Sequence, residues 1–78
     1  MKRTLLDLMD LNFEARILWL ELSSPHSERL QEIGFHPGRT VRLVARAPLG
    51  GPRVYQVGST LMALRHEEAE CAVIELLP

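Results

Sequence analysis

The side chains best suited to binding a metal lie close together near the carboxyl end of the chain. His66 and Glu70 are four residues apart and would share one face of a helical turn, and Cys71 follows directly. Imidazole, carboxylate and thiolate groups are common ligands of Zn²⁺ and Fe²⁺. His26 and His36, on either side of a second helical stretch, are further candidates. These residues are the candidates for a surface site that binds Fe²⁺ or Zn²⁺.

An alternative stands beside this metal site. The chain has no C-x-x-C or H-x-x-x-H pair, which are the spacings that mark dedicated metal sites. The three histidines would then be ordinary surface residues, and the single cysteine would be a small buried apolar one. No metal would be required for the fold.

Groups for catalysis and nucleotide binding do not form a recognisable pattern. Catalysis needs a positioned nucleophile and base or a tuned pair of carboxylates, and the only aspartates, Asp7 and Asp10, lie in a short N-terminal segment without an evident partner. Gly50 and Gly51 are followed by Pro52, not by the Gly-Lys-Ser/Thr sequence that holds phosphate. We expect a protein that is not an enzyme and requires no cofactor.

A tight reversal is predicted at residues 47–52, which read APLGGP. Pro48 fixes its own φ, the two glycines permit positive φ, and the second proline removes one donor from a strand ladder. The flanking runs 40–46 and 53–57 alternate between apolar and polar residues, which is typical of half-buried strands. These features together predict a β-hairpin.

The loop of this hairpin is also a candidate for binding a partner protein. Leu49 is an apolar side chain between a proline and a glycine, where exposure to solvent is hard to avoid. The alternative is that Leu49 folds back onto the domain. The candidate partner-binding residues here are Pro48, Leu49, Gly50, Gly51, Pro52 and, in the following strand, Tyr55.

A second apolar stretch covers residues 15–22 and has large side chains on both faces of a strand. Ile17 and Trp19 would point one way, whereas Leu18 and Leu20 would point the other. So small a domain can cover both faces only if a bulge resets the register. Either the strand is bulged and capped by the N-terminal segment, or Leu18 and Trp19 form a docking patch for a partner or a second copy of the chain.

The remaining elements are short and end at clear turn residues. Residues 4–11 have apolar side chains at helical spacing and predict one or two helical turns. Residues 24–34 predict a helix with Ser24 as the N-cap and Gly34 as the left-handed C-terminal residue. Further short elements are expected after the hairpin, namely a turn at 58–59, a strand at 61–64, a helical turn at 66–70 and a strand at 71–76.

These elements predict a mainly β fold, a small barrel of about five strands with one or two short helices. A chain of 78 residues is long enough for one domain, 1–78. Its net charge of −1 disfavours nucleic acid as a partner and leaves a membrane connection only through a partner protein. The lone cysteine and the missing signal sequence favour a cytoplasmic location.

Three segments resemble the ferrous iron transport protein A (FeoA) family. They read RLQEIGFHPG at 29–38, APLGGP at 47–52 and ALRHEEA at 63–69. The family pattern has RL-x-x-LG-x-x-PG, APLG followed by Asp or Gly and then Pro, and ALR-x-x-EA. The order and spacing of the motifs agree over nearly the whole chain.

The resemblance implies an SH3-like β-barrel that acts in the cytoplasm beside FeoB, the membrane GTPase and Fe²⁺ permease. It also implies an accessory or regulatory role in ferrous iron uptake without enzymatic activity. The alternative function is that of a metal-responsive regulatory domain, which would change its association state when Fe²⁺ or Zn²⁺ binds, with metal-bridged self-association as one form of the response.

Overall fold

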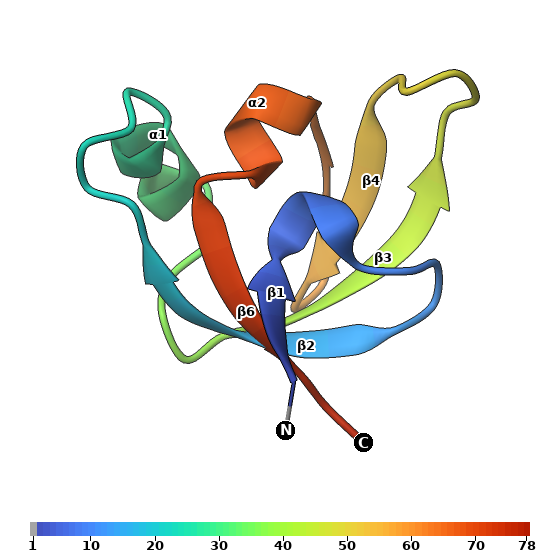
Figure 1. Cartoon of the computed structure of the whole chain (residues 1–78), viewed down its shortest axis with the longest axis horizontal. Helices are drawn as coiled ribbons and strands as arrows, with labels where there is room; N and C mark the ends of the chain where they lie inside the picture. Colours follow the sequence, from blue (N-terminus) through green and yellow to red (C-terminus); the bar gives the residue numbers. More distant parts are fainter. Residues whose placement is uncertain (1) are drawn as a thin grey trace.

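The computed structural model describes residues 2–78. Six strands form one curled sheet, with two short helices and a 3-10 turn at its open end (Figure 1). No helix in residues 2–78 is long and apolar enough to cross a membrane. In chain order the elements are β1 (Arg3–Leu5), η1 (Leu6–Leu8), β2 (Glu14–Leu20), α1 (Ser27–Glu32), β3 (Thr40–Arg46), β4 (Arg53–Val57), β5 (Thr60–Leu64), α2 (His66–Ala69) and β6 (Ala72–Leu76).

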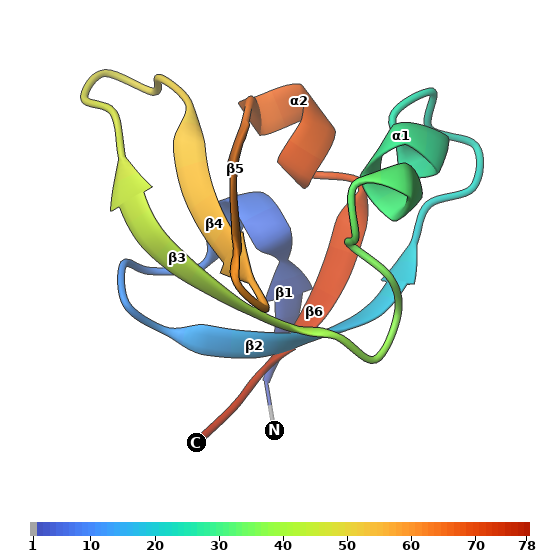
Figure 2. The same ribbon diagram turned by 180° about the vertical axis from the view of Figure 1, so that it is seen from behind.

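The sheet has the strand order β1-β6-β2-β3-β4-β5, and every neighbouring pair is antiparallel. Figure 2 shows how strongly the sheet curls, with β3 and β4 on one side, β6 on the other and β2 along the bottom. The edge strands β1 and β5 are not paired with each other, so the sheet is not closed. The predicted mainly β fold is confirmed, with six strands instead of about five.

The core lies inside the curl and is built around two aromatic rings. Phe35 and Tyr55 are fully buried and meet edge to face, with ring centroids 6.2 Å apart and an interplanar angle of 88°. Such a pair contributes about 0.5–1.5 kcal/mol beyond the area it buries. The Tyr55 hydroxyl donates a hydrogen bond of 3.0 Å to the carbonyl of Leu6, which fastens η1 onto the core.

The N-terminal segment differs from its prediction. Thr4 and Leu5 belong to β1, which pairs with β6, and only Leu6–Leu8 are helical. A strand of three residues is too short to reveal an alternating pattern, whereas the apolar residues of 4–11 satisfy a helical spacing equally well. Its partner strand, β6, lies at the other end of the chain, so the pairing leaves no pattern in the residues next to β1.

A bulge in β2 resolves the problem of the two-sided apolar strand. The register of β2 against β6 shifts between Ile17 and Trp19. As a result Ile17 and Leu20 are both buried, although they are three residues apart. Leu18 is half-buried and Trp19 is 44% exposed. The predicted reset of register is therefore present, and β2 ends at Leu20 instead of residue 22.

A comparable shift occurs in β3, between Leu43 and Ala45. The sequence places Val41, Leu43 and Ala45 on one buried face. Val41 and Leu43 are fully buried as expected, but Ala45 lies beyond the shift and is exposed. The bulge adds local twist and carries the end of the hairpin away from the core.

Helix α1 ends as predicted but begins later. Gly34 has φ 106°, the Gly34 N–H donates to Gln31, and the Phe35 N–H donates 2.9 Å to Leu30. These bonds form a Schellman motif that directs Phe35 into the core. The predicted N-cap is wrong, because the helix starts at Ser27 and the Ser24 hydroxyl accepts a bond from His26 within the preceding turn.

Backbone geometry confirms the predicted turn at 58–59 and shows two further turns, at Asn12 and at Gly38. Asn12 has φ 68° at the turn into β2, and Gly38 has φ 92° in a turn closed by a bond from Arg39 N–H to the His36 carbonyl. Gly58 has φ 62° in the two-residue loop between β4 and β5. Each turn is specified by residues adjacent in sequence, so tertiary context is not needed to predict it.

Candidate functional site

His66 lies between two carboxylates at the first turn of α2. Its Nδ1 is 2.7 Å from Oδ2 of Asp7, and its Nε2 is 3.2 Å from Oε2 of Glu70. Among the described residues, one group of three has potential metal-ligating atoms close enough together for a metal site. It consists of Asp7, His66 and Glu70, whose ligating atoms all lie within 4.8 Å of one another. The predicted pairing of His66 with Glu70 therefore exists, and Asp7 is its unpredicted third member.

Asp7 is the buried member of this group. Its side chain is 3% exposed, whereas those of His66 and Glu70 are 64% and 49% exposed. Burial raises the pKa of the Asp7 carboxyl above its usual value, while the neighbouring His66 acts in the opposite direction. Oδ1 of Asp7 has no hydrogen-bond donor among residues 2–78. A buried carboxylate with one free oxygen favours positive charge beside it.

Two elements bring these side chains together. The carbonyls of Asp7 and Met9 accept hydrogen bonds from the guanidinium of Arg53 at the start of β4, which holds the chain around η1 in place. The four-residue spacing on α2 places His66 and Glu70 on one helical face. One local feature could have drawn attention to Asp7: it is the single acidic residue in the otherwise apolar run 5–9.

The other predicted metal ligands lie outside the group. Cys71 is buried, and burial raises the pKa of its thiol, so the thiolate that metals prefer is disfavoured. His26 is half-buried in the turn before α1, where it borders the same surface hollow as Cys71 and Glu70. His36 is exposed in the turn before β3. None of these three belongs to the Asp7, His66 and Glu70 cluster.

The hairpin loop is the most exposed apolar feature of the described chain. Leu49 has a relative exposure of 104%, so its side chain does not fold back onto the domain. It also has φ 60°, a left-handed conformation that is unfavourable for a leucine. Gly50 follows with φ 75°, and Gly51 N–H donates to the Pro48 carbonyl to close the turn.

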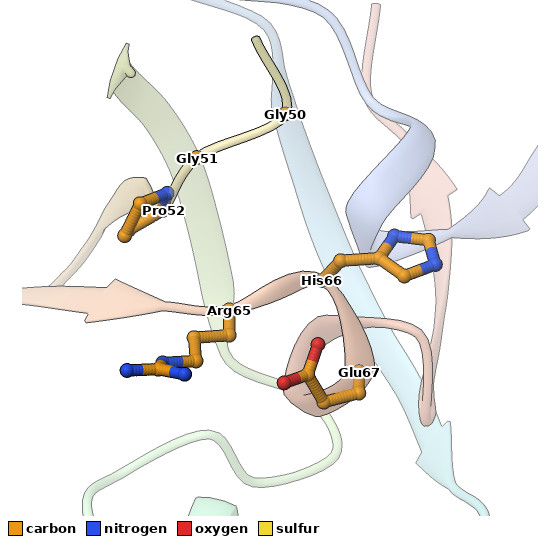
Figure 3. Close-up of a pocket in the computed structure, with 6 residues that line it drawn as sticks. All are labelled: Gly50, Gly51, Pro52, Arg65, His66 and Glu67. Atoms are coloured by element: carbon orange, nitrogen blue, oxygen red, sulfur yellow. The ribbon is translucent and has the colours of Figure 1, made fainter. Parts of the chain in front are cut away.

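His66 lies next to this loop. A shallow hollow is lined by Gly50, Gly51 and Pro52 from the hairpin and by Arg65, His66 and Glu67 from α2 (Figure 3). A neighbouring hollow joins His66 to Pro48 and Leu49. In Figure 3 the imidazole of His66 points away from Pro52 and Arg65, toward the side on which Asp7 lies. His66 and the hairpin loop thus lie at the same end of the molecule.

The remaining docking candidates lie elsewhere or are covered. Tyr55 is fully buried, so the inclusion of this residue in a partner surface is wrong. Its ring is used in the core and its hydroxyl in the bond to Leu6. Trp19 is partly exposed on β2, with the guanidinium carbon of Arg3 5.7 Å from the ring centroid. Leu18 is half-buried beside it.

Comparison with known proteins begins with the family of the domain. The FeoA domain matches residues 4–76. A search of curated proteins found no match. Among solved structures, FeoA from Stenotrophomonas maltophilia, crystallised with zinc, is 34% identical and superposes with a TM-score of 0.81, covering 92% of this chain and 89% of the other. That protein is described as a procaryotic SH3 domain protein and as a candidate activating factor for bacterial ferrous iron transport.

Two further structures share the fold. The iron(II) transport protein A from Clostridium thermocellum is 35% identical, with a TM-score of 0.87 over 95% of this chain and 46% of the other. A FeoA-like protein from Clostridium acetobutylicum is 19% identical, with a TM-score of 0.92 over 100% of this chain and 91% of the other. The predicted SH3-like fold is confirmed by these superpositions and by the family match.

Proposed function

Because the chain belongs to the FeoA family, we propose that it is a non-enzymatic accessory protein of ferrous iron uptake. In this proposal residues 1–78 act as one domain in the cytoplasm and bind the GTPase part of a FeoB-like membrane permease. The 34% identical FeoA from Stenotrophomonas maltophilia, described as a candidate activating factor for ferrous iron transport, supports the accessory role.

The conformation of Leu49 is the observation that supports docking through the hairpin. A fully exposed leucine with positive φ contributes nothing to the core and carries a conformational cost of about 1–2 kcal/mol. Strained backbone conformations cluster at functional sites, and exposed apolar groups mark interaction surfaces. We place Leu49 at the centre of the docking surface, with Pro48, Gly50, Gly51 and Pro52 setting its position.

A pull-down with the soluble GTPase domain of the permease tests this function. Wild type is compared with Leu49→Asp and with Leu61→Asp, a control on β5. Leu61 is 60% exposed, like Leu49 an apolar surface residue. It pairs with Gln56, near the end of β4 that lies away from the hairpin loop, which joins β4 at Arg53. We expect recovery to fall with Leu49→Asp and to stay at the wild-type level with Leu61→Asp. Equal recovery of all three proteins would remove the hairpin from the interface.

A second function is favoured by the metal-ligand geometry at His66. In this alternative the chain is a metal-responsive domain whose association state changes when Fe²⁺ or Zn²⁺ binds. Two observations support it: Asp7, His66 and Glu70 lie within metal-ligating distance, and the Stenotrophomonas maltophilia relative was crystallised with zinc. Trp19 and Leu18 on β2 are candidates for the contact between copies.

Light scattering coupled to size-exclusion chromatography tests the second function. The molar mass of the full chain is measured in chelator, in Zn²⁺ and, under anaerobic conditions, in Fe²⁺. We expect a metal-dependent rise in mass that is lost in His66→Ala and kept in His36→Ala. A mass that is the same in all three buffers would exclude a change of association state.

A further inference from the structure

We propose that His66 Nε2 and the Glu70 carboxylate are the two protein ligands of a divalent transition-metal site, and that Asp7 orients the imidazole through Nδ1 without binding the metal. This assignment deepens the second function proposed above, because it names the atoms that would take the metal. It stands on the geometry of the isolated chain and does not depend on any partner protein.

The two distances around the imidazole fit different roles for the two carboxylates. Zinc lies about 2.0–2.2 Å from nitrogen and oxygen ligands, so two ligands at tetrahedral positions are about 3.3–3.6 Å apart. The separation of His66 Nε2 and Glu70 Oε2 is 3.2 Å, close to the lower end of this range, so a small side-chain movement would admit the ion. The separation of His66 Nδ1 and Asp7 Oδ2 is 2.7 Å, which is the length of a charge-assisted hydrogen bond.

Asp7 therefore has the role that carboxylates commonly have beside metal-bound histidines. A histidine that binds a metal through one ring nitrogen usually donates the other N–H to a carboxylate or carbonyl, which fixes the tautomer and increases the basicity of the ligand nitrogen. Asp7 is suited to this role because it is buried and η1 is held by Arg53. Its Oδ1, which no donor within residues 2–78 reaches, leaves the carboxylate in need of a nearby cation.

Access and ligand type define the class of metal. The side chains of His66 and Glu70 are exposed, so an ion can enter from solvent and can keep water in its remaining positions. Imidazole and carboxylate ligands suit Zn²⁺ and Fe²⁺, whereas a softer site would need a thiolate. The only cysteine is outside the group. We therefore expect the site to bind a divalent ion of intermediate softness, such as Zn²⁺ or Fe²⁺, with water completing its coordination.

Titration of the full chain with Co²⁺ and Zn²⁺ tests the ligand assignment. Co²⁺ reports its coordination through visible absorption, and calorimetry with Zn²⁺ gives stoichiometry and affinity. We expect one equivalent to bind the wild type and affinity to be lost in both His66→Ala and Glu70→Gln. Two variants are matched controls. His36→Ala changes an exposed histidine outside the group, and Glu67→Gln changes the exposed glutamate that directly follows His66 in α2. Both controls should bind like wild type.

The role of Asp7 needs a readout other than affinity alone. In Asp7→Asn we expect affinity to fall by about 10–100-fold, as is typical for residues that support a ligand from outside the coordination shell. Nitrogen chemical shifts of His66 in the zinc-loaded wild type should show a protonated Nδ1 and a metal-bound Nε2. Circular dichroism verifies that each variant is folded, and Glu70→Gln keeps the size of the side chain.

The outcomes that overturn the proposal are specific. Equal affinity in wild type and Glu70→Gln, no binding by wild type at millimolar metal, or a metal on Nδ1 of His66 would each refute the assignment. A site that binds one metal while the chain stays at the same molar mass would keep this proposal and refute only the second function.

Discussion

Arg29 of α1 and Glu68 of α2 form an ion pair that joins two helices across 39 positions of the sequence. Glu68 is buried, and its second carboxylate oxygen accepts a 3.0 Å hydrogen bond from the Arg65 N–H at the start of α2. Arg29 and Glu68 belong to the first and third sequence motifs that resemble the FeoA family. The two motifs therefore supply a contact that holds α2, and with it His66, in place.

The first prediction concerns the stability contributed by this contact. Arg29→Ala leaves the Glu68 carboxylate buried with only the Arg65 N–H as a donor. Because the Arg29 side chain is 58% exposed, the loss is smaller than for a fully buried pair. We expect the free energy of unfolding to fall by about 1–3 kcal/mol, measured as a shift of the urea midpoint.

The exposed pair of Arg42 and Glu14 is the control for that measurement. Its side chains are 46% and 47% exposed. Arg42→Ala should change the free energy of unfolding by less than about 0.5 kcal/mol. If both substitutions have the same effect, the Arg29 contact has no special structural role.

The second prediction is an alkaline loss of stability caused by Tyr55. Burial raises the pKa of the Tyr55 hydroxyl to about 12 from an ordinary 10. Above pH 10 the unfolded chain loses this proton while the folded chain keeps it, so the contribution of Tyr55 to stability is complete below pH 10 and disappears as pH rises through 12. The slope should reach about 1.4 kcal/mol per pH unit, measured by urea unfolding at a series of pH values.

Tyr55→Phe separates this effect from other titrations. The variant should lack the Tyr55 contribution to the alkaline slope, and at neutral pH it should lose about 1 kcal/mol because the Leu6 carbonyl no longer receives its hydrogen bond. Tyr55 is the single tyrosine of the chain, so phenolate absorbance follows it alone. A phenolate transition near pH 10 in the folded protein would contradict the predicted burial effect.

Local signals in the sequence were sufficient for much of the fold. The conformations of Asn12, Gly34 and Gly58 follow from turn chemistry within a few residues, and the structure has positive φ at all three. The loop between β3 and β4 was predicted for the same reason. Ser24 shows where this reasoning fails. Its hydroxyl can accept a backbone N–H either as a helix N-cap or within a turn, and in the structure it accepts from His26 in the turn before α1.

Long-range relationships were not accessible in the same way. Asp7 approaches His66 because β1 pairs with β6 and η1 follows β1, and a pairing between the two ends of the chain leaves no local pattern. The alternation along β4 places Tyr55 and Val57 on the same face of the strand, but it does not show that this face is the fully buried one. The proximity of His66 and Glu70 was predictable because both side chains lie on one helical turn.

The third prediction concerns the end of α1. Gly34 has φ 106°, and a Cβ added there would meet no heavy atom within 4 Å, so conformational strain is the only direct cost of a larger residue. Gly34→Ala should lower the free energy of unfolding by about 1–2 kcal/mol. Gly34→Asn should lose less, because asparagine tolerates left-handed geometry. The urea midpoints of the two variants decide this, and an unchanged midpoint in Gly34→Ala would show that the helix end adapts without strain.

The fourth prediction separates stability from binding at Leu49. Asparagine tolerates the positive φ of this position and exposes no apolar surface, so Leu49→Asn should keep or raise the free energy of unfolding, by up to about 1 kcal/mol. The same substitution should reduce recovery on the GTPase domain of the permease, because it removes the apolar group that we propose to enter the partner. Thermal unfolding and the pull-down are measured on one preparation. A leucine kept against its own conformational preference is explained by binding only if stability does not fall, so a destabilised Leu49→Asn would assign the residue to the fold.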